Sequence, residues 1–188
     1  MRERCLTLCS AGKTFSCTGW KIGWAVGPSW IIQNLSRLSL YQTFSVATPL
    51  QIAVARTLRA AEGKNFYNKF VEEYEHRRQL LCDILAENSL PPVIPSGTFF
   101  VLADISRVDP RHYYDPNDKD TGRDWQFCRW LTKVIGVCAI PVTPFCCIES
   151  RPTYDRFVRF AFCKTVADIK EASVRLRRLK DYLLPPDV

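Results

Sequence analysis

A short turn that carries one lysine between two apolar stretches constrains the fold of this chain more than any other feature. Residues 5–9 (Cys-Leu-Thr-Leu-Cys) form a short, bounded apolar run, which is typical of a buried strand. Residues 22–27 are apolar again, and the turn between the two runs holds Lys13, with Lys21 eight positions later. The pattern predicts two strands that project a lysine from a tight turn. A solvated side chain is the commonest outcome for such a lysine.

Two special roles could explain Lys13. The letters Gly-Lys-Thr at residues 12–14 match the end of a phosphate-binding loop, but that motif requires a glycine where Thr7 stands and is therefore excluded. The other role is an amine nucleophile that forms a Schiff base with pyridoxal phosphate. The phosphate of that cofactor needs hydroxyl donors and a fixed cation, which Ser10 and Lys21 would supply.

The lysine turn also resembles a known family. Residues 10–24 read Ser-Ala-Gly-Lys-Thr-Phe-Ser-Cys-Thr-Gly-Trp-Lys-Ile-Gly-Trp, which is similar to the cofactor-lysine segment of fold-type I aminotransferases. The segment is most similar to the kynurenine aminotransferase group, also called glutamine transaminase K or cysteine-S-conjugate β-lyase. In that group a lysine stands at the position of Lys21, where most relatives carry arginine. The resemblance implies an α/β, aspartate-aminotransferase-like fold in which Lys13 is the catalytic lysine. It also implies that Ser10, Lys13 and Lys21 bind pyridoxal 5'-phosphate.

The whole sequence predicts two parts. Residues 1–62 would be the C-terminal part of the large cofactor-binding domain, and residues 63–188 a small α+β domain with its own three-stranded sheet. The expected helices cover residues 29–40, 48–62, 65–88, 124–135 and a final stretch from residue 165 onward. The expected strands cover residues 97–103, 137–142 and 157–162.

Local signals refine this outline. Ser29 is a candidate N-cap, and Gly63 is expected to end the second helix. Residues 41–47 are expected to be irregular, and the polar residues 109–123 predict a mobile surface loop. Residues 165–168 (Thr-Val-Ala-Asp) resemble a capping box at the start of the last helix.

Arg159 is the second residue with a candidate chemical role. Strand alternation places it on the same face as Phe157 and Ala161, opposite Val158 and Phe160. A guanidinium there either faces water from an edge strand or needs a carboxylate partner, because an unpaired buried charge is costly. In the aminotransferases that the chain resembles, the arginine of the matching Phe-Val-Arg-Phe motif binds the substrate α-carboxylate through a bidentate fork.

Four further residues match substrate-site positions of the same family. Phe44 matches an aromatic residue that reaches the active site of the neighbouring subunit. Gly97, Phe100 and Phe145 match residues that line the pocket for the substrate side chain. Such a pocket would favour aromatic or large neutral amino acids. For each aromatic residue, ordinary core packing is the alternative.

Composition excludes several other classes of protein. No run approaches the roughly 20 apolar residues of a membrane-spanning helix, so no membrane partner is expected. The 9 cysteines form no C-x-x-C pair and there are 2 histidines, so neither a zinc site nor a disulfide framework is indicated. Reduced thiols favour a cytoplasmic or mitochondrial-matrix location. The net charge of +7 falls on polar sides of expected helices, which favours a solvated surface over a nucleic-acid partner.

The resemblance implies roughly the C-terminal 45% of an aminotransferase. The family's aspartate at the cofactor's pyridine nitrogen, its ring asparagine, its stacking aromatic residue and its glycine-rich phosphate turn all precede the lysine.

Three hypotheses remain open. The first is a transaminase, homodimeric in its full-length form, that acts on kynurenine, glutamine or another aromatic or large neutral amino acid and a 2-oxo acid. Cysteine-S-conjugate β-lyase activity would accompany it. The second is a non-catalytic truncated isoform that docks on a full-length subunit, and the third is a basic nucleic-acid-binding module. The chain by itself is expected to be a poor catalyst, with Leu6, Leu8, Trp20, Ile22 and Trp24 exposed.

Overall fold

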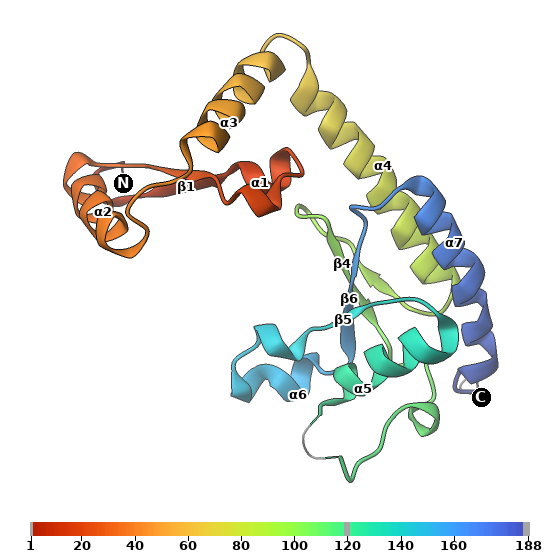
Figure 1. The fold of residues 1–188 in the computed structure, drawn as a ribbon. Coiled ribbons are helices and arrows are strands. Elements are labelled where there is room, and N and C mark those ends of the chain that lie inside the picture. The colour runs from red at the N-terminus through yellow and green to blue at the C-terminus, as the bar shows by residue number, and fades with distance from the viewer. Residues whose placement is uncertain (1, 119–120, 186–188) are drawn as a thin grey trace. The chain divides into compact units, whose positions relative to one another are not determined.

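The computed structural model describes residues 2–118 and 121–185. The chain forms two compact units, Met1–Asn68 and Lys69–Val188. Helix α4 (Phe66–Glu87) begins in the first unit and continues into the second, as Figure 1 shows. The predicted helix over residues 65–88 is therefore confirmed. The assignment of the two parts to a large and a small domain stays a prediction.

The first unit begins with a hairpin. Strand β1 (Thr7–Ser10) pairs antiparallel with β2 (Gly23–Val26), and the short helix α1 (Ala11–Thr14) follows β1 directly. The two strands are present as predicted, but β1 is not the buried strand that its apolar run indicated, since Leu8 is 74% exposed. The exposure expected of Leu8, Trp20 and Trp24 in this chain is confirmed. The main buried cluster of this unit is small and consists of Ala11, Ile22 and Val54. The prediction that Ile22 is exposed is therefore also wrong.

Two helices complete the first unit. Helix α2 (Ser29–Gln42) follows Pro28, which occupies the N-cap position, and no side chain caps the helix. The predicted cap at Ser29 is wrong because Ser29 already has helical geometry. Helix α3 (Thr48–Ala61) begins with a proline in its first turn and ends before Gly63, whose φ is +72°. This helix and its ending agree with the sequence.

The second unit contains a four-stranded antiparallel sheet with strand order β3–β4–β6–β5. The strands are β3 (Pro92–Val93), β4 (Phe100–Asp104), β5 (Ile140–Pro141) and β6 (Phe157–Ala161). The prediction of three strands missed β3, whose two residues lie among prolines that interrupt strand patterns. The strand predicted over residues 97–103 begins only at Phe100, and the one predicted over residues 137–142 is reduced to β5.

The core of the second unit lies on one face of this sheet. Val101 and Ala103 of β4 and Val158 and Phe160 of β6 are buried there, while the alternate residues are half-buried. The apolar sides of α4, α5 (Arg123–Trp130) and α7 (Val166–Leu176) contribute the rest of the core. In Figure 1, α4 and α7 lie along the same side of the strands.

The ends of these helices follow local chemistry. Helix α5 continues as a π-helical turn (Leu131–Ile135) and ends at Gly136, which has a left-handed φ of 84°. The end of the helix predicted over residues 124–135 is thus confirmed. Helix α7 has the predicted capping box between Thr165 and Asp168 and continues as a 3-10 helix, Arg177–Tyr182. The remaining helix of this unit, α6, spans Arg151–Tyr154.

The segment 109–123 differs from its prediction. Asp109 and Tyr113 are buried, and a 3-10 turn (Pro110–His112) connects them. The Arg111 guanidinium donates hydrogen bonds to the Asp109 carboxylate, with Nε at 2.8 Å from Oδ2. This part of the segment is therefore packed structure and not a plain surface loop. Residues 119 and 120 of the predicted loop lie outside the described residues.

Three further observations concern the class of protein. Across residues 2–118 and 121–185, no helix combines the length and apolar character that crossing a membrane requires. Over the same residues, His, Cys, Asp and Glu side chains form no group of three or more that could hold a metal ion. All nine cysteines are free thiols.

Candidate active site

The lysine turn closes at one end of the β1–β2 hairpin. Ser10 is the N-cap of α1, and its Oγ accepts a hydrogen bond of 3.1 Å from the Gly12 backbone N–H. The Ala11 N–H donates to the Ile22 carbonyl at 3.0 Å, which returns the chain to the start of α1. This closure gathers Ser10, Lys13 and Lys21 at the same end of the hairpin. Lys21 has a left-handed φ of 55°, a strained backbone that the closed turn maintains.

Close backbone packing fixes this hairpin end. The Thr18 hydroxyl donates to the Gly12 carbonyl at 3.1 Å, which joins the far side of the turn to α1. A Cβ atom on Gly12 would lie 3.2 Å from Thr18 Cα, and one on Gly23 only 2.7 Å from the Cys9 carbonyl oxygen. Position 23 therefore accepts only glycine without a backbone shift.

The side chains at this end suit pyridoxal phosphate. Lys13 and Lys21 are exposed on the described surface, so an amine and a cation are both accessible. Ser10 Oγ accepts one bond and keeps its own hydroxyl proton for another acceptor. An amine for the aldehyde, together with a hydroxyl and a cation for the phosphate, is the donor set that this group requires. These residues fit the cofactor.

Phe44 lies at the end of α2 in the same unit. Its φ is +62° and its side chain is 80% exposed. It borders a shallow cavity of about 380 Å³ with Ile32, Leu35 and Leu40 of α2 and Ala25 of β2. Phe44 is thus not a core residue of this unit, which argues against the core-packing alternative.

Arg159 occupies the centre of the sheet in the second unit. Its backbone is paired with Leu102 of β4 on one side and with Ile140 of β5 on the other, so β6 is no edge strand. The side chain projects from the half-buried face, opposite the core, as strand alternation predicted. Its Nε is buried and has no hydrogen-bond partner in the structure. The edge-strand explanation for this arginine is therefore excluded.

The nearest acidic residue on the same face does not neutralise Arg159. Asp104, two positions after Leu102 on β4, forms an ion pair with Arg156 at 3.4 Å. Within the described ranges, no carboxylate forms an ion pair with Arg159. An arginine in this condition has an unused planar fork of donors, which matches the geometry of a carboxylate.

Two of the predicted pocket residues contact the Arg159 side chain. Its Cζ lies 3.9 Å from the centre of the Phe100 ring and 4.6 Å from the centre of the Phe145 ring. Phe100 is the diagonal neighbour of Arg159 across the β4–β6 pair, because Phe100 pairs with Ala161. Gly97 lies in the bend before β4, and a Cβ atom there would meet nothing within 4 Å. Whether these residues line the substrate pocket stays a prediction.

The predicted site residues therefore form two groups. Ser10, Lys13, Lys21 and Phe44 belong to the first unit, and Gly97, Phe100, Phe145 and Arg159 to the second. Sequence reasoning missed Asp124, a fully buried carboxylate at the start of α5 that bonds to the segment before Phe145. Its position at the start of a helix was visible in the sequence, but its distant partners were not.

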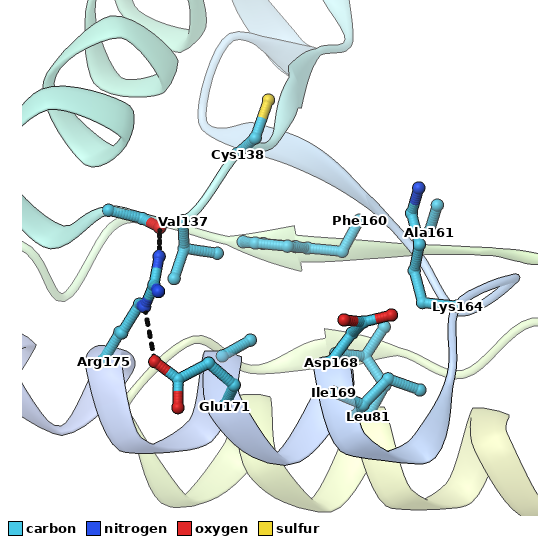
Figure 2. Close-up of a pocket in the computed structure, with 12 residues that line it drawn as sticks. Leu81, Val137, Cys138, Phe160, Ala161, Lys164, Asp168, Ile169, Glu171 and Arg175 are labelled. Atoms are coloured by element: carbon cyan, nitrogen blue, oxygen red, sulfur yellow. Dashed lines mark hydrogen bonds and ion pairs between the residues drawn. The ribbon is translucent and has the colours of Figure 1, made fainter.

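A separate cavity of about 460 Å³ lies in the second unit on the core side of the sheet. Figure 2 shows its apolar wall, formed by Leu81, Val137, Phe160 and Ile169. Arg175 crosses its edge, donating to the Gly136 carbonyl at 2.8 Å and to Glu171 at 2.9 Å. None of the predicted site residues is among the residues that line this cavity.

Comparison with known proteins gives a consistent result. The profile of the "Aminotransferase class I and II" family matches residues 1–176. A kynurenine–oxoglutarate transaminase of Dictyostelium discoideum is 40% identical over 188 residues, which is 96% of this chain and 42% of that protein. The human kynurenine–oxoglutarate transaminase 3 is 37% identical over 171 residues, covering 87% of this chain and 37% of that protein.

Solved structures agree with these sequence matches. The crystal structure of Bna3p from Saccharomyces cerevisiae, described as a putative kynurenine aminotransferase, superposes with a TM-score of 0.89 at 36% identity. The match covers 95% of this chain and 43% of that protein. The fold is thus the fold-type I, aspartate-aminotransferase-like fold. The chain spans about two fifths of the length of the relatives that it matches.

Proposed function

Because the chain belongs to the class I and II aminotransferase family, we propose that it carries the cofactor lysine and the carboxylate-binding arginine of a pyridoxal-phosphate-dependent aminotransferase. The reaction transfers an amino group from an amino acid to a 2-oxo acid. The observation that carries the proposal is Arg159, whose guanidinium contacts two aromatic rings, whose Nε is buried, and with which no carboxylate of the described residues forms an ion pair.

Arg159 binds the α-carboxylate of the substrate. Its central position in the sheet, paired on both sides, fixes the backbone from which the guanidinium projects. A partly buried site has a lower effective dielectric than water, so a charge-assisted, bidentate pair with a carboxylate gains strength there. The carboxylate also provides the partner that the arginine lacks within the described structure. Amino acids and 2-oxo acids share this group, so one arginine serves both substrates.

Lys13 has two roles in the proposal, cofactor attachment and proton transfer. Its Nζ would hold the cofactor through the aldehyde, and as a free amine it would move the proton at the substrate Cα as general base and acid. Ser10 and Lys21 hold the phosphate from the same hairpin end. When bound, pyridoxal phosphate supplies an electron sink for the electron pair released at Cα.

The finer substrate choice is a further part of the proposal. Relatives at 37–40% identity are named kynurenine–oxoglutarate transaminases, which supports kynurenine as the amino donor. We include glutamine and other aromatic or large neutral amino acids in the proposal. Phe100 and Phe145 provide aromatic surface beside the carboxylate site. We extend the proposal to cysteine-S-conjugate β-lyase activity and to a homodimer in which Phe44 serves the neighbouring subunit.

The test compares Arg159→Lys with wild type in the complete aminotransferase that contains these residues. Lysine keeps the charge but loses the planar fork, so kcat/KM for phenylalanine should fall by about tenfold or more. Single-turnover reaction with phenethylamine, which lacks the carboxylate, should change far less. Equal losses for the two substrates would assign Arg159 to folding and refute the proposal.

A second candidate function has its own observation. The first unit exposes many large apolar side chains, among them Leu8, Val26, Trp30, Leu38, Tyr41 and Phe44. Exposed apolar surface of this extent marks an interaction site, which suits a non-catalytic chain that docks on a full-length aminotransferase subunit. Co-expression of the tagged 188-residue chain with that subunit tests it. A stable complex of altered activity would favour docking, and separate elution on gel filtration would refute it.

A further inference from the structure

We propose that Asp124 is a positioning residue for substrate binding. It holds the turn that carries Phe145 so that the Phe145 ring covers the guanidinium of Arg159. This inference rests on the proposed function, because it concerns the affinity of Arg159 for the substrate carboxylate. It adds a residue that touches neither the substrate nor the cofactor.

The Asp124 carboxylate is fully buried and accepts hydrogen bonds from a distant segment. Its Oδ2 accepts from the backbone N–H groups of both Val142 and Thr143, each at 2.8 Å. Its Oδ1 accepts from the Thr143 hydroxyl at 3.1 Å and from the Trp125 N–H at 2.9 Å. In the part of the chain that the structure describes, no cation forms an ion pair with it. Its charge is balanced by these donors instead.

This pattern exceeds what a helix start needs. An acidic residue in the first turn stabilises a helix through the macrodipole, and one bond to a nearby N–H would satisfy that role. Here three of the four donors belong to Val142 and Thr143, which follow Asp124 by 18 and 19 residues and lie in the turn after β5. The carboxylate therefore acts as a tether between two segments.

The tethered turn leads directly to Phe145. Residues Thr143–Phe145 form a 3-10 turn, closed by bonds from the Phe145 N–H to the Val142 carbonyl at 2.9 Å and from the Cys146 N–H to the Thr143 carbonyl at 3.1 Å. The position of Phe145 therefore follows from where Asp124 holds the start of the turn.

Phe145 has little reason to be aromatic other than its contact with Arg159. It is 65% exposed and contributes nothing to the buried core. Its ring centre lies 4.6 Å from Arg159 Cζ, on a guanidinium that Phe100 already contacts at 3.9 Å. Contact with two rings limits the positions of the guanidinium and removes water from the surface that they touch, while its remaining N–H groups can bind a planar carboxylate. Less ordering is then lost when the carboxylate binds.

The experiment uses the complete aminotransferase with four variants. Phe145→Leu removes the ring but keeps apolar volume, and Phe145→Tyr keeps the ring. Asp124→Asn removes an acceptor from the tether. Tyr154→Leu is the matched control, because Tyr154 is an exposed aromatic residue of α6 whose ring contacts Phe157. KM and kcat for phenylalanine are measured, together with the dissociation constant of 3-phenylpropionate for the cofactor-free enzyme by calorimetry.

Phe145→Leu should raise the KM and the dissociation constant by about three- to tenfold, the scale of a partly exposed cation–π contact, with a smaller change in kcat. Phe145→Tyr should restore both values, and Tyr154→Leu should leave both unchanged. Asp124→Asn should produce the loss seen for Phe145→Leu, and adding Phe145→Leu to it should cause little further loss, because both changes disturb one contact. If Asp124→Asn does not fold, Thr143→Val, which removes one of the four bonds, replaces it.

Two results would overturn the inference. One is that Phe145→Leu behaves like Tyr154→Leu in both measurements. The other is that the losses from the Asp124 and Phe145 changes add fully, which would make Asp124 a general stabiliser of the fold. Failure of the proposed function looks different, because Arg159→Lys would then leave the dissociation constant of 3-phenylpropionate at the wild-type value.

Discussion

Individual charged residues in this chain occupy three distinct environments. Arg159 is half-buried between two aromatic rings, whereas Lys13 and Lys21 are exposed at the end of a hairpin. Asp124 is fully buried and balanced by neutral donors. Among the described residues, Nε of Arg159 and Nε of Arg78 are the buried side-chain donors without a hydrogen-bond partner. Arg78 uses its terminal nitrogens for Glu75 and the Pro95 carbonyl, whereas no carboxylate in the described ranges forms an ion pair with Arg159. These environments agree with the proposal that Arg159 binds a ligand and that Asp124 has a structural role.

The role of Lys13 leads to a direct chemical prediction. In the complete aminotransferase, Lys13→Ala should abolish covalent retention of pyridoxal phosphate, because the attacking amine is gone, and should lower turnover by orders of magnitude. Borohydride reduction followed by mass spectrometry of the peptides measures the attachment. Lys64→Ala, another exposed lysine of the same unit, should retain the wild-type attachment. Cofactor trapped on any lysine in the Lys13→Ala variant would refute the assignment.

Lys21 should behave differently from Lys13. It supplies a cation to the phosphate and no covalent bond, so Lys21→Ala should weaken cofactor binding by on the order of 1–3 kcal/mol. Equilibrium titration of the cofactor-free enzyme measures this loss. Unchanged affinity would show that Lys21 lies away from the phosphate.

The lowered pKa of Asp109 predicts that the folded state loses stability at acid pH. Side-chain hydrogen bonds from Arg111 lower the pKa of Asp109 from its ordinary 3.8 to about 2, helped by a bond from the Arg111 backbone. Because the folded pKa lies below the unfolded value, this stabilisation is present above about pH 4 and is lost as the pH falls toward 2. Asp109→Asn should therefore flatten the acid side of the Tm-against-pH curve. The exposed Asp181→Asn control should keep the wild-type slope, and a parallel loss in both variants would contradict the assignment.

At the scale of secondary-structure elements, the β1–β2 hairpin positions the cofactor residues. Gly23→Ala would place a Cβ 2.7 Å from the Cys9 carbonyl oxygen, so the two strands must separate. The variant should lose affinity for pyridoxal phosphate, measured by titration, although no residue that touches the cofactor has changed. Gly19→Ala, where a Cβ would meet nothing within 4 Å, is the matched control. Equal affinities of the two variants would show that the hairpin does not set the site.

Most elements could be predicted from the sequence because their signals are local. The helical spacing of α4, the proline and glycine around α3 and the capping box of α7 each lie within a few residues of the element they define. The apolar runs alone predicted strands but not their exposure, since such a run does not show what covers it. The exposure of Leu8 and Trp24 was expected only from the resemblance, which places the sheet they pack against outside this chain. The short strand β3 lacked any periodic pattern.

In the candidate site, too, features with a local sequence signal could be predicted, and features that depend on distant residues could not. Lys13 and Arg159 could be recognised because each lies in a compact stretch that resembles a family motif. The central position of β6 and the two rings on Arg159 come from strand pairing, which joins residues far apart in sequence. Asp124 illustrates this limit, because its partners lie 18 and 19 residues away and nothing local marks them.

At the scale of the whole molecule, the two units differ in how many apolar side chains they bury. The second unit has one contiguous core formed by its sheet and the helices α4, α5 and α7. The buried cluster of the first unit is small and consists of Ala11, Ile22 and Val54, with Ala61 buried apart from it. Local unfolding is governed by such differences in buried apolar contacts, so the units should not open with the same free energy.

The last prediction follows from this difference and concerns the 188-residue chain alone. Its first unit should exchange amide hydrogens and be cut by protease well before the second, because the side chains of Leu8, Trp30 and Tyr41 are exposed and its core is small. A protected fragment from about residue 69 onward is expected by mass spectrometry. Catalysis should be weak or absent, since a hairpin that opens readily cannot hold Lys13, Ser10 and Lys21 in one geometry, and positioning contributes much of an enzyme's rate.

The decisive assay supplies the isolated chain with phenylalanine, a 2-oxo acid and pyridoxal phosphate. Turnover on the order of 1 per second, typical of enzymes, from a soluble chain with uniform protection would contradict this prediction. Adding the remaining part of a full-length relative in trans separates two causes of inactivity. If the hairpin becomes protected and turnover appears, the exposed apolar surface is an assembly surface that completes the site. If protection appears without turnover, the inactivity is caused by the residues of the site itself and not by the opening of the hairpin.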